Sequence, residues 1–187
     1  MIVKLPFPAR LCDLMSVKGK SELINGRIVV YPPMGGIPGR VQQAILFALH
    51  DYAVATGCGE VFTRSLGYAL PAPLKSGRQS FCADASYHVG PWPENPMGFI
   101  PAAPTFAVEV MCLPDYEPGQ SEVRAAKRAD YFEAGTLVVW DVDPVGQTVT
   151  KYDASDPTIG TTFRPGDTAD AEPAVPGWRL DVTALFA

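Results

Sequence analysis

The chain has 187 residues, of which 47% are hydrophobic and 19% charged, and its formal net charge is −5. The length suits one domain, and the composition supplies a core and argues against disorder. The acidic balance counts against a protein that coats nucleic acid through bulk positive charge. It still allows an enzyme that meets DNA at a local basic patch or through a metal ion.

The cysteines and the N-terminus carry no targeting or metal signal. Cys12, Cys58, Cys82 and Cys112 are scattered, without the paired spacing of a zinc site or a disulfide framework. The opening MIVKLPFPAR has no secretory apolar core, and no apolar run approaches the ~18 residues of a membrane span. We therefore expect free thiols and a soluble, cytoplasmic protein without a membrane partner.

The first half of the chain predicts a hairpin and a helix within a single domain over residues 1–187. Residues 1–20 are expected to form an N-terminal arm or short helix. Asn25-Gly26 lies between two apolar runs and predicts a β-hairpin, because both residues tolerate positive φ. After a loop over residues 32–39, apolar residues recur at helical spacing as far as Gly57; they are Val41, Ala44, Ile45, Ala48, Leu49 and Tyr52.

Alternating patterns then predict strands. Residues 60–70 alternate along one strand, and residues 81–89 sort by period two, with Asp84 on the polar face. After a long loop, residues 104–112 read PTFAVEVMC, which is typical of a short buried strand.

The second half of the chain predicts a helix, a hairpin and a tail. Residues 121–135 indicate a helix with Ser121 as its N-cap and Gly135 as its stop. Two strands around residues 143–146 form a second hairpin, and residues 156–187 are a Pro- and Gly-rich C-terminal extension. The order of elements predicts an α/β fold with a mixed sheet.

Three polar residues stand where an apolar core would be expected. Glu109 lies near the middle of the buried strand, where a carboxylate costs several kcal/mol unless it is paired, protonated or bound to a cation. Asp84 lies 25 residues earlier, which leaves room for the chain to return to an adjacent strand. Lys127 interrupts the apolar stripe of the later helix, which also includes Val123 and Tyr131.

Two carboxylates on neighbouring strands form a hard-oxygen site for Mg²⁺ or Mn²⁺. Such a cation would offset the cost of burying Glu109. A nearby ammonium could hold an attacking water or stabilise charge that develops on a phosphate. Asp84, Glu109 and Lys127 are thus the minimum set for metal-assisted hydrolysis of a phosphodiester. The alternative from the residues alone is that Glu109 pairs with Arg64 or Lys127 without a metal.

Five motifs in this order resemble the Uma-two family of restriction endonucleases, within the PD-(D/E)xK nuclease superfamily. The resemblance runs from about residue 21 to the closing PGWRLDV. Its motifs are ELINGRIV from Glu22, Ala83-Asp84, APTFAVEV ending at Val110, KRADYFEAG from Lys127, and VWDVDP ending at Pro144.

The resemblance implies a restriction-endonuclease-like domain, with a mixed, curved β-sheet flanked by helices, that hydrolyses DNA. Asp84, Glu109 and the carbonyl of Val110 would hold the metal, and Glu22 would complete the metal shell or activate water. The standard superfamily lysine falls at Met111 here, and the family is thought to move it to the following helix, where Lys127 lies.

Three alternatives remain open from the sequence. A catalytically inactive nuclease fold would bind nucleic acid or a partner protein without cutting. A metal-dependent hydrolase could act on RNA or a nucleotide. A structural or oligomeric module would pair Glu109 with a cation of the chain and expose Asp84. A nuclease that cuts both strands would suit a homodimer.

Overall fold

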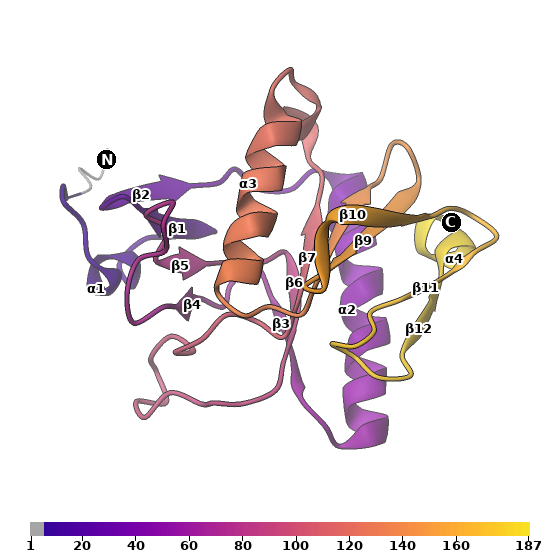
Figure 1. Ribbon diagram of the computed structural model, residues 1–187, viewed down its shortest axis with the longest axis horizontal. Coiled ribbons are helices and arrows are strands. Elements are labelled where there is room, and N and C mark those ends of the chain that lie inside the picture. Colours follow the sequence, from indigo (N-terminus) through magenta and orange to yellow (C-terminus); the bar gives the residue numbers. More distant parts are fainter. Residues whose placement is uncertain (1–5) are drawn as a thin grey trace.

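The computed structural model describes residues 6–187, and its centre is a six-stranded mixed sheet (Figure 1). The strand order is β10-β9-β8-β7-β6-β3, with β7 and β8 parallel and the other neighbours antiparallel. The predicted α/β class is therefore confirmed. In chain order the strands are β3 (Glu60–Thr63), β6 (Ala85–His88), β7 (Phe106–Val110), β8 (Val138–Asp143), β9 (Thr148–Asp153) and β10 (Asp156–Phe163).

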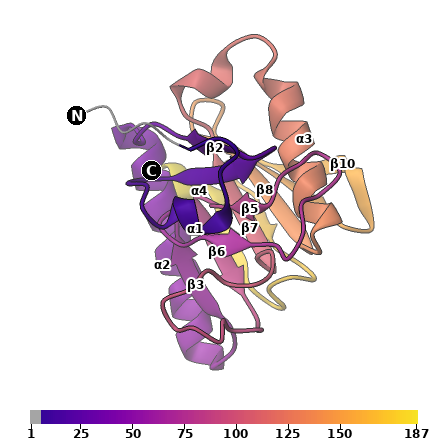
Figure 2. The same ribbon diagram turned by 90° about the vertical axis from the view of Figure 1, so that its left-hand side faces the viewer.

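Two helices cover opposite faces of this sheet, α2 (Gly36–Thr56) and α3 (Gln120–Glu133) (Figure 2). The alternation of side chains along β7 explains the arrangement, because successive residues point to opposite faces. Phe106, Val108 and Val110 join the core cluster that contains the buried residues of α2. Ala107 packs on the other side with Tyr131 of α3. Glu109 shares the face of Ala107, so its carboxylate points toward α3.

Helix α2 follows the predicted apolar stripe but begins earlier than expected. Val41, Ile45 and Leu49 are its buried residues. The helix begins at Gly36, so the predicted loop over residues 32–39 is too long. The helix ends at Gly57, whose φ of +65° is the left-handed conformation that favours glycine.

Smaller elements surround the central sheet. The predicted hairpin is present as β1 (Ser21–Ile24) and β2 (Arg27–Val30), with positive φ at Asn25 and Gly26. The remaining elements are α1 (Leu11–Leu14), β4 (Tyr68–Ala69), β5 (Ser80–Phe81), the 3₁₀ helix η1 (Leu113–Tyr116), β11 (Thr168–Asp170), β12 (Arg179–Asp181) and α4 (Val182–Phe186). Of the predicted N-terminal arm, residues 1–5 lie outside the described residues. The predicted extension over residues 156–187 contains β10, β11, β12 and α4.

Three local predictions are wrong. Residues 60–70 are not one strand, because the chain turns after Thr63. The Thr63 carbonyl accepts a hydrogen bond from the Leu66 amide, and the Thr63 hydroxyl accepts one from the Ser65 amide. Residues 81–89 are divided between β5 and β6 by a bend that contains Asp84. Helix α3 begins at Gln120 with Gly119 as its N-cap, in place of Ser121.

Among residues 6–187, all four cysteines are free. No helix in this described range is long and apolar enough to cross a bilayer.

The core under β7 generates the first prediction. Phe106 is fully buried and meets Trp140 edge to face, with 5.2 Å between ring centroids. We expect Phe106→Ala to lower the free energy of unfolding by about 3–5 kcal/mol, because it removes a buried ring and leaves a cavity. Phe47→Ala is the control, since Phe47 is 60% exposed, and should cost less than about 0.5 kcal/mol. Urea unfolding measures both, and equal losses would contradict the assignment of this core.

Candidate active site

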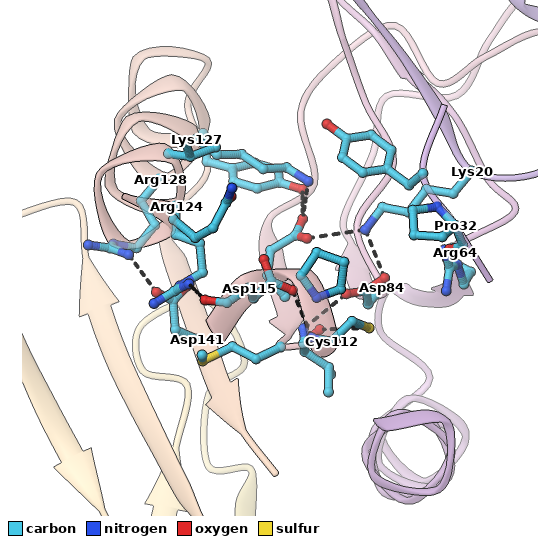
Figure 3. A pocket seen from close by; sticks show the side chains of 18 of the residues that line it. Lys20, Pro32, Arg64, Asp84, Cys112, Asp115, Arg124, Lys127, Arg128 and Asp141 are labelled. Atoms are coloured by element: carbon cyan, nitrogen blue, oxygen red, sulfur yellow. Dashed lines mark hydrogen bonds and ion pairs between the residues drawn. The ribbon is translucent and has the colours of Figure 1, made fainter. Parts of the chain in front are cut away.

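The Glu109 carboxylate is compensated by two lysines from different elements (Figure 3). Its side chain is 15% exposed. Oε1 lies 2.7 Å from Lys127 Nζ and accepts a hydrogen bond of 2.6 Å from the Tyr131 hydroxyl. Oε2 lies 3.2 Å from Lys20 Nζ. Burial raises the pKa of Glu109, but Lys127 and Lys20 outweigh it, so the pKa is lowered and the group is a carboxylate.

Asp84 lies in the bend just before β6, with its side chain only 5% exposed. Oδ1 lies 2.8 Å from Lys20 Nζ, and Oδ2 accepts a hydrogen bond of 2.9 Å from the Val110 amide. Burial raises the pKa of Asp84, although Lys20 opposes this shift. Lys20 therefore bridges the two carboxylates that the sequence predicts as metal ligands.

Glu22 of β1 is fully buried and has four polar partners. It accepts hydrogen bonds of 2.8 Å from the Tyr31 hydroxyl and 3.0 Å from the Cys82 amide, and it lies 3.0 Å from Lys127 Nζ. Its fourth partner is the Arg78 guanidinium. Burial alone would raise the pKa of Glu22, but Lys127 and Arg78 lower it to about 2.

Lys127 joins the two glutamates from α3. Its side chain is 12% exposed, and its ammonium contacts both Glu22 and Glu109. Burial lowers the pKa of Lys127, but the two glutamates raise it by more than burial lowers it. The net pKa is raised, so the lysine is a cation. The predicted apolar stripe on α3 is only partly buried, since Tyr131 is fully buried whereas Val123 is 58% exposed.

The structure thus brings Glu22, Asp84, Glu109 and Lys127 together, and it adds three residues that sequence reasoning missed. Lys20 precedes β1, Tyr31 follows β2, and Arg78 precedes β5. Arg78 also bonds Asp130 of α3, with Nε 2.7 Å from the carboxylate. Arg64, named in the sequence as an alternative partner for Glu109, bonds the Pro32 carbonyl instead.

Most of these side chains line a pocket of about 200 Å³ between the hairpin, β7 and α3, whereas Glu22 lies buried behind Lys127 and does not line it (Figure 3). More cations than carboxylates line it, although the whole chain is acidic. The cations are Lys20, Arg64, Arg78, Arg124, Lys127 and Arg128, and the carboxylates are Asp84, Glu109, Asp115 and Asp141. Four of these cations are in ion pairs, and among the described residues only Arg64 and Arg124 are not.

The donor set of the pocket fits a hard divalent cation. Asp84 Oδ1 and Glu109 Oε2 converge on one point, which the ammonium of Lys20 fills at 2.8 and 3.2 Å. Within residues 6–187, no three acidic, histidine or cysteine side chains form a ready-made metal cluster. A metal would therefore rest on two carboxylates, with backbone oxygens and water as further ligands.

The sheet, its two covering helices and the acidic-lysine pocket define a nuclease-like α/β domain. The crystal structure of "a putative nuclease belonging to DUF820" from Anabaena variabilis superposes with a TM-score of 0.71 and 22% identity. The match covers 94% of this chain and 96% of that one. None of the curated proteins matches the chain.

Residues 8–183 match the model of the Uma2 family, which is described as "Putative restriction endonuclease". The match covers nearly the whole chain, so the protein belongs to this family, and the resemblance read from the sequence is confirmed.

The Glu22 environment predicts a specific dependence of stability on pH. Its pKa is about 2 in the folded protein, below the ordinary 4.5, so its ion pairs stabilise fully above pH 4.5. This contribution falls by about 1.4 kcal/mol per pH unit below that value. Glu22→Gln should therefore cost about 3 kcal/mol at pH 7, and the deficit should shrink by about 2 kcal/mol by pH 3.

Chemical denaturation of wild type and variant between pH 7 and pH 3 measures this difference. Glu94→Gln is the matched control, because Glu94 is exposed. A deficit for Glu22→Gln that is constant over the range would contradict the ion-pair account.

Proposed function

We propose that this protein is an endonuclease that hydrolyses phosphodiester bonds in DNA with the help of Mg²⁺ or Mn²⁺. The observation that carries the proposal is that Asp84 and Glu109 converge on one point, which the Lys20 ammonium fills. Lys127 Nζ lies 2.7 Å from the same glutamate. Membership of the Uma2 family supports a nuclease, and the DNA substrate and the metal are our extension of it.

Asp84, Glu109 and the backbone carbonyl of Val110 would hold the metal, since all three residues line the pocket. A bound divalent cation polarises a phosphate and lowers the pKa of water. The Lys127 ammonium is placed to orient the attacking water or to stabilise charge on the phosphate in the transition state. Glu22 holds Lys127 in position through the 3.0 Å contact.

Two arginines at the pocket support a substrate with phosphates. Arg64 donates to the Pro32 carbonyl and Arg124 to the Asp115 carbonyl, and within the described chain neither forms an ion pair. Their remaining N–H groups are thus available. A guanidinium binds a phosphate with two parallel hydrogen bonds. Figure 3 shows Arg64 and Arg124 on opposite sides of the pocket, which suits a backbone that passes over it.

One observation favours the alternative, a nuclease fold that binds nucleic acid or protein without cutting. Lys20 and Lys127 already neutralise Glu109, so the carboxylates need no metal for the fold to form. A purely structural module, however, predicts an exposed Asp84, whereas this side chain is 5% exposed. A homodimer that cuts both strands stays a prediction.

The nuclease proposal predicts metal-dependent cleavage that depends on Glu109 and Lys127. Purified protein would be incubated with supercoiled plasmid, single-stranded DNA and RNA, in Mg²⁺, Mn²⁺ or EDTA. Glu109→Gln and Lys127→Met should each lower the cleavage rate at least about 100-fold, because they remove a metal ligand and a transition-state cation. The exposed Glu94→Gln and Lys75→Met, with the same changes of charge, should cleave like wild type.

Cleavage of RNA but not DNA would change the proposed substrate from DNA to RNA and would leave the proposed site unchanged. If the folded wild type cleaves nothing, or if both site variants cleave as fast as wild type, the nuclease proposal is wrong.

The arginine observation predicts a local electrostatic contribution to DNA binding. Arg64→Gln and Arg124→Gln should each weaken binding of duplex DNA in EDTA. Each should also reduce the slope of log affinity against log salt by about one, because one phosphate contact is lost. Fluorescence anisotropy across a salt series measures both quantities. Arg164→Gln, an exposed residue between β10 and β11, is the control. Equal slopes for all four proteins would contradict a phosphate-binding role.

A further inference from the structure

Lys20 occupies the point on which the two candidate metal ligands converge. Its ammonium lies 2.8 Å from Asp84 Oδ1 and 3.2 Å from Glu109 Oε2, and its side chain is 5% exposed. An ammonium among carboxylate oxygens makes the same charge contacts that a divalent cation would make there.

A metal and the Lys20 ammonium cannot both occupy this point. The two carboxylates of Asp84 and Glu109 carry two negative charges, and Lys20 and Lys127 already balance them in the pocket. A divalent cation added beside Lys20 would meet like charge within a few ångströms in a site shielded from water, which is strongly unfavourable. Displacement of Lys20 removes the repulsion and frees one oxygen of each carboxylate.

The space beside the pocket is large enough to be considered as a second position for the Lys20 side chain. A second, more open groove adjoins the pocket on the hairpin side, and both are lined by Lys20, Tyr31, Pro32 and Arg64. Lys20 thus lies at the boundary between the two. The Tyr31 ring centroid is 5.3 Å from the Lys20 ammonium, which is within cation–π distance. Because Tyr31 lines both the pocket and the groove, its ring can contact the lysine in either position. Gly19, which precedes Lys20, has no atom within 4 Å of the position that a Cβ would take.

We propose that Lys20 is an internal counter-cation, which holds Asp84 and Glu109 together in the absence of metal and competes with the metal for them. Metal binding then requires the Lys20 side chain to move from the pocket into the adjoining groove. Lys20 thereby sets the metal concentration at which the site fills. This inference rests on the metal site of the proposed function, and its tests read metal binding and lysine accessibility rather than cleavage.

The first test measures Mn²⁺ affinity without nucleic acid, by titration calorimetry or from the electron paramagnetic resonance of free Mn²⁺. Lys20→Met keeps the length of the side chain and removes the competing charge. It should lower the Kd for Mn²⁺ about tenfold or more relative to wild type. Lys75→Met is the matched control, because Lys75 is exposed, lines neither the pocket nor the groove, and loses the same charge. It should bind like wild type.

The outcomes separate this inference from the proposed function. If wild type and Lys20→Met bind Mn²⁺ with equal affinity, or if the variant binds more weakly, Lys20 does not compete and the inference is overturned while the metal site stands. If neither the wild type nor any folded variant binds Mn²⁺, the metal-dependent function is wrong, and this inference is wrong with it.

A second test uses the wild-type chain and so does not depend on the folding of a variant. Lysines would be acetylated under limiting reagent with and without saturating Mn²⁺, and the modified residues quantified by mass spectrometry. Release into the open groove should raise the labelling rate of Lys20 severalfold. Labelling of Lys75 should be unchanged, because Lys75 is exposed and lines neither the pocket nor the groove. Labelling of Lys20 that is unaffected by bound Mn²⁺ would show that the side chain does not move, and would overturn the proposal.

Discussion

The burial of the Glu109 carboxylate is the constraint on which the site depends. A carboxylate in the middle of a core strand is stable only if cations and donors replace the water that it loses. No neighbour on β7 can do this, since the strand reads FAVEV. The compensation comes from outside the sheet, from Lys127 and Tyr131 of α3 and from Lys20 beside the β1–β2 hairpin. The contacts that build the candidate active site are therefore also the structural solution to a buried charge.

This solution ties together elements that share little backbone pairing. The hairpin is a separate two-stranded sheet, yet Glu22 contacts Lys127 on α3, and Lys127 contacts Glu109 on β7. Lys20 continues the chain of charges to Asp84 at the start of β6. Loss of one member of such a buried network leaves an uncompensated charge, so it costs more than the contact itself contributes. The pocket is thus formed by the same contacts that fix the hairpin against the sheet.

Glu22, Asp84, Glu109 and Lys127 could be named from the sequence, because each breaks an apolar pattern or matches a family motif. Lys20 could not, since KGK contains two similar lysines and no periodicity distinguishes them. A signal was nevertheless present. The Asn25-Gly26 turn fixes the register, so Lys20 lies two residues from Glu22 on the same strand face and opposite Tyr31. The strand break at Asp84 was not readable, because it depends on pairing with the distant β7.

The lysine beside Glu109 comes from a different element than the superfamily pattern predicts. Residues 107 and 109 of β7 share the face toward α3, and Met111, just past the end of the strand, lines the pocket at the position where the standard superfamily would place an ammonium. Here that ammonium reaches Glu109 from α3 instead, at 2.7 Å. A catalytic cation acts through its distance from the reacting groups, and the element that carries it is free to change. The same freedom allows a second lysine, Lys20, to approach the other oxygen from the hairpin. The pocket therefore holds two cations in different settings, since Lys127 lies between two glutamates and Lys20 lies beside an open groove.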